Sequence, residues 1–157
     1  VAARQESEKL ALRHPQGHLI NIADAEAAVA TVARFDVFQL AGAWMKGDAL
    51  RVSRLLDGLE EEGEEPVLLL WAVAEDIRTL IRLTAALKQG QNIQSLRNSL
   101  RLWGDKQTLA PMAAKRISIN RLLDALKTCA KIDRIIKGAE EGDAWIEFKQ
   151  LVTSLAA

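Results

Sequence analysis

The strongest constraint on the fold is one long apolar stretch, from Pro66 to Leu87, that contains no glycine and no second proline. Leucine and alanine are frequent in it, and both favour helix. Proline suits the first position of a helix, because its missing N–H group would have no partner there. The first half of the stretch is apolar nearly all round, which is typical of a helix contacted on several sides. It therefore predicts a long central helix that other helices surround.

The rest of the chain also carries helical patterns, and no segment alternates strictly enough to predict a half-buried strand. Side chains suited to helix N-caps stand at Asp36, Asp48, Asn92, Ser118 and Asp143. Pro111 is expected early in a short helix that reaches Ile117, since proline is tolerated in a first turn. We predict an all-α fold with helices over residues 2–13, 21–32, 37–46, 49–59, 66–87 and 119–137, and shorter ones after Asn92, around Pro111 and after Asp143.

Apolar spacing predicts which helical faces are buried. The helix before residue 60 is expected to bury Leu50, Leu55, Leu56 and Leu59, and the helix over 119–137 to bury Leu122, Leu123, Leu126, Ala130, Ile132 and Ile136. Trp44, Trp71 and Trp145 lie on apolar faces and are expected in the core. Trp103, at a turn beside Gly104, has two interpretations. Core packing is preferred, and an exposed anchor for a partner is the alternative.

The first two helices cannot enclose a core by themselves. We therefore expect residues 1–34 to be the end of one helical domain and residues 35–157 to form a separate bundle. Val1 is no natural start, so the chain is expected to be a piece of a longer protein.

Cysteine usage and hydropathy indicate the compartment. One cysteine, Cys129, excludes an internal disulfide and fits a reducing compartment. The longest apolar run, residues 67–74, is too short to span a bilayer, and no secretory signal is visible. We expect a soluble, cytoplasmic chain without a membrane partner.

The charge is balanced in total but uneven along the chain. The formal net charge of zero argues against a general nucleic-acid binder. Residues 48–65 hold seven acids against two arginines, whereas residues 76–137 hold thirteen Lys and Arg against four acids. The basic half could face an acidic partner or a phosphate backbone. The acidic residues 60–65 could attract a cation or a basic partner, or form a solvated linker.

No pattern in the sequence supplies a catalytic centre. A phosphate-binding loop and a dinucleotide-binding fingerprint are both absent. His14 and His18 could be half of a metal site or a pH-sensitive pair, but two loop histidines are the simpler interpretation. Cys129 has no histidine in its half of the chain, so packing is favoured over nucleophilic chemistry. We predict no enzyme activity, no metal and no cofactor.

The surface offers candidates for an interface instead. Basic side chains are spread over four predicted helices, whereas a DNA-binding helix-turn-helix concentrates them on one. A protein interface, direct binding of nucleic acid and plain solvated surface are the alternatives. The candidate interface residues are Arg78, Arg101, Trp103, Arg116, Arg121 and Arg134. Asp133 and Lys137 stand four residues apart and predict a surface ion pair.

The C-terminal third resembles a known family. Residues 126–138 read LKTCAKIDRIIKG, and residues 145–151 read WIEFKQL. These segments are similar to the ending of the delta subunit of the bacterial DNA polymerase III clamp loader, which tends to show Asp, three mostly apolar residues and Lys-Gly. The matching residues here are Asp133, Lys137 and Gly138.

Upstream segments extend the resemblance over the whole chain. Residues 65–71, EPVLLLW, look like the entry into the family's long collar helix, and Arg78 matches a basic position within it. Residues 47–49, followed by the leucine pair at 55–56, are similar to the preceding helix. Residues 5–12 and 21–32 are similar to the end of the family's small lid domain.

The resemblance implies a domain plan and a role. Residues 1–34 would be a partial AAA+-type helical lid domain, and residues 35–157 a helical collar that joins subunits. The chain would be a non-catalytic structural and oligomerisation module that supports loading of the sliding clamp onto primed DNA. Its collar partners would be subunits of the gamma/tau and delta-prime types. The clamp would be reached through a further domain of the protein, and DNA only through the assembled loader. A helical DNA-binding or regulatory domain, using the basic surface of residues 76–137, is the alternative.

Overall fold

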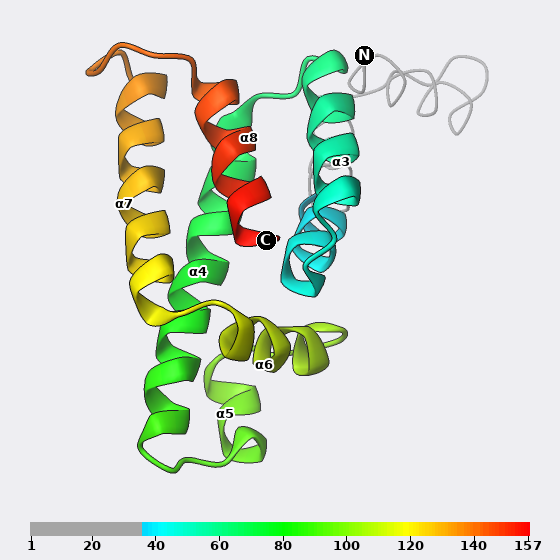
Figure 1. Cartoon of the computed structure of the whole chain (residues 1–157), viewed down its shortest axis with the longest axis vertical. Coiled ribbons are helices and arrows are strands. Elements are labelled where there is room, and N and C mark those ends of the chain that lie inside the picture. Colours follow the sequence, from blue (N-terminus) through cyan, green and yellow to red (C-terminus); the bar gives the residue numbers. More distant parts are fainter. Residues whose placement is uncertain (1–35) are drawn as a thin grey trace, which may run out of the picture.

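The computed structural model describes residues 36–157, and these are helical apart from the connecting turns, with no strand among them (Figure 1). The all-α prediction is confirmed. The helices predicted over 2–13 and 21–32, the two histidines and the partial lid domain lie outside the described residues.

One helix forms the axis of the bundle and the others pack around it. A helix over residues 36–46 is followed by α3 (Ala49–Glu61), α4 (Pro66–Lys88), α5 (Ile93–Ser99), α6 (Lys106–Arg116), α7 (Ile119–Ile136) and α8 (Ala144–Leu155). The long helix α4 contacts α6, α7 and α8, and α8 also contacts α3 and α7. α7 runs antiparallel to α4, so the start of α4 lies beside the end of α7 (Figure 1).

Most helix starts follow from local chemistry. The carboxylates of Asp48 and Asp143 accept from the backbone N–H groups of the third residue of α3 and of α8, both at 3.1 Å. Asn92 caps α5, Ser118 caps α7, and Pro66 is the first residue of α4. These starts were predicted, and each of the four side-chain caps satisfies a backbone donor that the helix itself leaves unpaired.

Two predicted helix starts are wrong. Asp36 is not an N-cap, because residue 36 is already helical. Pro111 is not early in its helix, because α6 begins at Lys106 and carries the proline inside. The first turn of α6 is held by i+3 hydrogen bonds, from Gln107 to Gly104 at 3.2 Å and from Thr108 to Asp105 at 3.1 Å. Pro111 lies in the second turn and has no N–H to donate to the carbonyl oxygen of Gln107, so α6 lacks one intrahelical hydrogen bond there.

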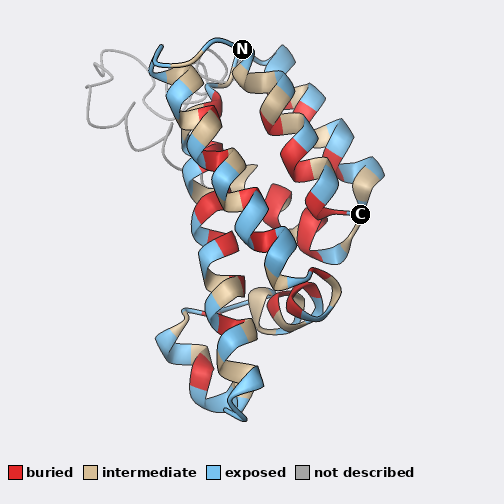
Figure 2. Cartoon of the chain, turned by 60° about the vertical axis from the view of Figure 1, so that its left-hand side comes forward, coloured by how far each residue is buried: buried red, intermediate tan, exposed pale blue. Residues whose placement is uncertain are grey.

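The core lies along the inner faces of the helices, where buried positions recur every three or four residues (Figure 2). Trp44 is fully buried, and Trp145 packs edge-on against Phe148 with ring centroids 6.0 Å apart. Burying a leucine or phenylalanine stabilises the fold by roughly 1.5–3 kcal/mol relative to exposure. The buried side chains of α4 include Leu69, Leu70, Val73, Ile77, Leu80 and Leu83.

Several apolar residues that were expected inside are exposed. Trp71 is 57% exposed and Leu68 is 48% exposed, although both lie on the central helix α4. Leu50 is 62% exposed. It precedes the buried Val52 by two residues and therefore points about 200° away from it around the helix.

The buried seam of α7 also differs from the prediction. It consists of Leu122, Ala125, Cys129 and Ile132, whereas Leu123 is 43% exposed. Ala130 is also exposed, and Leu126 and Ile136 are half-buried. α7 contacts both α4 and α8, and small residues in the seam allow helices to pack closely.

Ion pairs join helices that are distant in sequence. Lys106 Nζ lies 2.8 Å from Oδ1 of Asp76, a residue of α4 whose side chain is almost completely buried. Burial raises the pKa of Asp76, and the neighbouring Lys106 opposes that rise. Lys149 of α8 pairs with Asp57 at 2.9 Å and also with Glu60. These contacts fix α6 on α4 and α8 on α3.

Candidate protein-interaction surface

An open groove of about 520 Å³ runs between α4 and α7. Three predicted residues meet in it: Arg78 of α4, Asp133 of α7, and Lys137 directly after the end of α7. The remaining lining residues are Leu70, Trp71, Ala74, Glu75, Leu126, Cys129 and Ala130. The groove thus combines an exposed indole and small apolar side chains with charged groups on both walls.

Each wall of the groove carries one acid and one base. On α7, Lys137 Nζ lies 2.7 Å from Asp133 Oδ2, which confirms the predicted i, i+4 pair. On α4, Arg78 Nη1 lies 3.4 Å from Glu75 Oε2. All four side chains are at least 31% exposed, so each pair contributes only about 0.2–1 kcal/mol. The charges are therefore available to a partner at low energetic cost.

Cys129 lies at the base of the groove and is buried. Burial raises the pKa of its thiol to about 11, and the nearby charge of Arg78 only partly opposes this. The thiolate is the reactive form of cysteine. The burial of Cys129 confirms the prediction that it is a small packed residue.

Arg116 and Arg121 serve the fold itself. Arg116 donates through Nη1 to the carbonyl oxygen of Leu155 at 2.8 Å, and through Nη2 to that of Trp44, also at 2.8 Å. Arg121 Nη2 donates to the carbonyl oxygen of Ser154 at 2.7 Å. Carbonyl groups at a helix C-terminus carry partial negative charge, which explains why guanidinium groups gather there. The two predicted interface residues are thus placed together at the end of α8.

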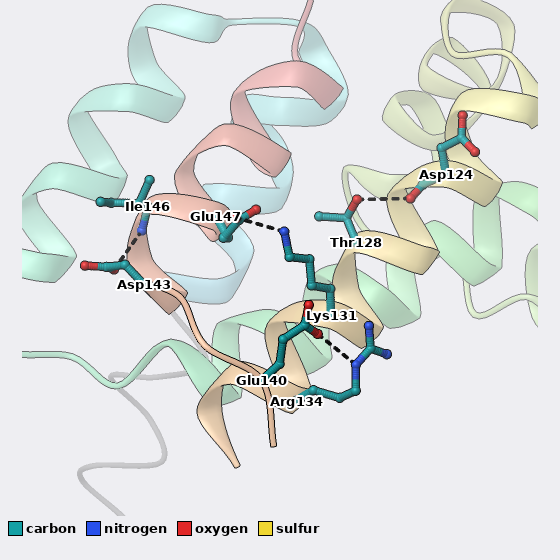
Figure 3. Close-up of polar contacts among 8 residues, drawn as sticks. All are labelled: Asp124, Thr128, Lys131, Arg134, Glu140, Asp143, Ile146 and Glu147. Atoms are coloured by element: carbon teal, nitrogen blue, oxygen red, sulfur yellow. Dashed lines mark hydrogen bonds and ion pairs between the residues drawn. The ribbon is translucent and has the colours of Figure 1, made fainter. Parts of the chain in front are cut away.

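Arg134 also has a contact within the chain (Figure 3). Its Nε donates to Glu140 Oε2 at 2.9 Å, in the connection between α7 and α8. Beside it, Lys131 Nζ donates to Glu147 Oε1 at 3.2 Å, which joins the two helices directly. These pairs hold the connection in place, so Arg134 is a structural contact at this corner as well as a surface charge.

Arg101 and Trp103 occupy the turn between α5 and α6. Leu102 is fully buried, whereas Trp103 is 62% exposed. The preference for core packing of Trp103 is therefore wrong, because the turn directs the leucine inward and its neighbours outward. Arg101 has φ 56, a left-handed conformation that is uncommon outside glycine. This pair forms a second exposed corner, well separated along the chain from the residues of the groove.

Within residues 36–157, no three His, Cys, Asp or Glu side chains are grouped in a way that could hold a metal ion. In the same range, no helix is both long and apolar enough to cross a bilayer.

Three features of the structure were not found from the sequence: the exposure of Trp71, the hydrogen bonds of Arg116 within the chain, and the pairing of the buried Asp76 with Lys106. The only sequence signal for the pairing of Asp76 with Lys106 was the position of Asp76 within the most apolar predicted helix. For Trp71, periodicity placed the residue beside buried leucines but could not predict that it lines the open groove between α4 and α7.

Comparison with known proteins gives consistent matches. The sequence model of the family described as "DNA polymerase III delta subunit, C-terminal domain" matches residues 35–153. The chain is 27% identical over 159 residues to DNA polymerase III subunit delta of Haemophilus influenzae, covering 96% of this chain and 46% of that protein. It is 26% identical over 151 residues to DNA polymerase III subunit delta of Escherichia coli, covering 96% and 43%. The chain therefore spans less than half the length of these relatives.

Proposed function

Because the chain belongs to the family of DNA polymerase III delta subunits, we propose that it is the structural and oligomerisation module of a clamp-loader delta subunit. In this proposal residues 35–157 form the collar domain, and residues 1–34 are the end of the lid domain. The module has no catalytic residue of its own. It supports the loading of the sliding clamp onto primed DNA by holding the subunits of the loader together in the cytoplasm.

The observation that carries the proposal is the groove between α4 and α7. Arg78, Asp133 and Lys137 converge there beside the exposed Trp71. A subunit interface of ordinary size needs about 800 Å² of well-defined surface on each partner. A bundle with a continuous core presents such a surface without reactive side chains, and exposed tryptophan and arginine are typical anchors of such interfaces.

The partners follow from the family. The collar would contact loader subunits of the gamma/tau and delta-prime types. The sliding clamp would be contacted by another part of the delta subunit, and DNA would be approached through the assembled loader. Charges on the bundle surface would steer assembly more than they would increase affinity.

A second candidate function is direct binding of nucleic acid by the basic surface. The exposed Trp103 beside Arg101 favours it, since aromatic side chains stack on bases. Three of the candidate arginines, Arg116, Arg121 and Arg134, instead direct their guanidinium groups to acceptors within the chain. The basic surface offered to a phosphate backbone is therefore smaller than the sequence suggests.

Mixing the chain with the remaining loader subunits of its organism, followed by size-exclusion chromatography, tests the proposal. We expect co-elution at low and at moderate salt. The same chain should bind DNA weakly, whereas a true DNA-binding domain would bind tightly at low salt and lose affinity steeply as salt rises. Failure to form any complex with loader subunits, together with tight DNA binding, would favour the second candidate.

A further inference from the structure

We propose that the groove between α4 and α7 binds one amphipathic helix of another clamp-loader subunit, with small apolar residues facing Trp71 and acidic residues facing Arg78 and Lys137. The inference rests on the proposed function and goes beyond it by assigning one groove and one kind of partner element.

The backbone of the groove favours a helix as the occupant. Both walls are α-helices whose N–H and C=O groups are paired within each helix, so an extended segment would find no backbone partners there. A helix brings its own hydrogen bonds and can lay a row of side chains into the furrow between two antiparallel helices. Ala74 and Ala130 line that furrow, and their small side chains permit close approach.

The charges define the chemistry of the partner. Lys137 lies at the end of α7, next to the start of α4, and Arg78 lies two turns along α4 from Trp71. The charge of Arg78 acts on Cys129 of α7, and Lys137 stands eight residues beyond Cys129 on that antiparallel helix, so the two cations are separated by about 12 Å along the groove. Glu75 and Asp133 stand between them. The complementary helix therefore carries two acids about two turns apart, with a base between them.

Trp71 is the expected anchor. Its side chain is more than half exposed and lines the groove. Nucleic acid is a poor occupant of the same groove, because Glu75 and Asp133 would face its phosphates.

Photo-crosslinking tests the occupant. p-Benzoylphenylalanine in place of Trp71 is introduced into the full chain, which is then mixed with the other loader subunits and primed DNA and irradiated. We expect crosslinks to one segment of a loader subunit, and that segment should be an amphipathic helix with the acid–base–acid spacing. Crosslinks to DNA, to an extended segment, or none while a complex forms would overturn the inference.

Affinity measurements separate this inference from the proposed function. Trp71→Ala is expected to weaken binding to the loader subunits by roughly tenfold or more, and Arg78→Glu to weaken it as well. Leu50→Ala is the control, because Leu50 is similarly exposed but lies on α3, away from the groove.

If Trp71→Ala binds like Leu50→Ala while the unsubstituted chain still binds, the groove assignment is wrong and the proposed function stands. If the unsubstituted chain does not bind at all, the proposed function fails and the inference fails with it. Circular dichroism melting confirms that each variant is folded.

Discussion

Arg116 and Trp44 are joined across 72 residues by a hydrogen bond of 2.8 Å from the guanidinium Nη2 to the carbonyl oxygen. The same guanidinium donates to the carbonyl oxygen of Leu155. One side chain therefore bonds to carbonyl groups near the C-terminal ends of two helices. Gly47 allows this approach: it has φ 83, and a Cβ there would come within 3.3 Å of the Ala156 carbonyl oxygen. The N-terminal and C-terminal helices of the described bundle are thus tied to each other through α6.

Arg116→Lys is expected to lower the free energy of unfolding by about 1.5–3 kcal/mol, because one ammonium cannot serve both helix ends and hydrogen bonds from charged groups are worth that much. Urea denaturation measures the change. Lys115→Ala, at the exposed neighbouring position, should change stability by less than about 0.5 kcal/mol. Equal effects of the two substitutions would show that the contact is not structural.

Lys106→Met should destabilise the fold by about 3–5 kcal/mol, since it leaves the buried Asp76 carboxylate without its cation. The double variant Lys106→Met with Asp76→Leu should recover most of that loss, because no charge then remains buried. Denaturant titration of both variants checks the pair. No recovery in the double variant would mean that the lysine acts through packing alone.

The effect of Lys106→Met should shrink on acidification. Burial already raises the pKa of Asp76 above 3.8, and removing the lysine raises it further. The folded protein then takes up this proton at a pH where the unfolded chain remains ionised, so the burial penalty is full at neutral pH and is relieved as pH falls through the folded pKa. Unfolding free energies of the variant and the parent, measured from pH 7 downward, should converge. A constant gap would contradict this explanation.

The Cys129 thiol should be almost inert in the folded protein. Its pKa of about 11 leaves about one thiol in a thousand ionised at pH 8, and burial also restricts access. Reaction with 5,5′-dithiobis(2-nitrobenzoate) should be slow in buffer and fast in 8 M urea. Rapid reaction in buffer would indicate that this part of α7 opens readily.

Trp103→Ala should leave stability almost unchanged, within about 0.5 kcal/mol, because the side chain is largely exposed. It should weaken association with loader subunits if the corner at Arg101 and Trp103 belongs to the interface. Trp44→Ala provides the contrast: that residue is fully buried, and the substitution should lower the unfolding free energy by about 3–5 kcal/mol. Thermal melts together with binding assays separate the two effects.

Helix positions were largely predictable because their signals are local. Asp48, Asn92, Ser118 and Asp143 cap the helices that follow them, and Gly138 follows the end of α7. The start of α6 was missed although Asp105 stands directly before it, and the Asp105 side chain makes no capping hydrogen bond. Pro111 was expected in the first turn of the helix, and this expectation placed the start of α6 later than Lys106.

Which face of each helix is covered was less predictable. A period of 3.6 tells which residues share a face, but the neighbours that cover it are decided by the packing of the whole bundle. Trp71 is exposed although it follows the buried Leu70, because it lines the open groove between α4 and α7. The contact from Arg116 to Trp44 joins residues far apart in sequence, and no local pattern encodes it.

A competition experiment tests the central claim most directly. A labelled full-length delta subunit from the same organism is bound to the other loader subunits, and the unlabelled 157-residue chain is titrated in while fluorescence anisotropy is followed. If this chain is the oligomerisation module, it should displace the full-length subunit at concentrations near its own dissociation constant. No displacement at large molar excess, with the chain shown to be folded, would contradict the account.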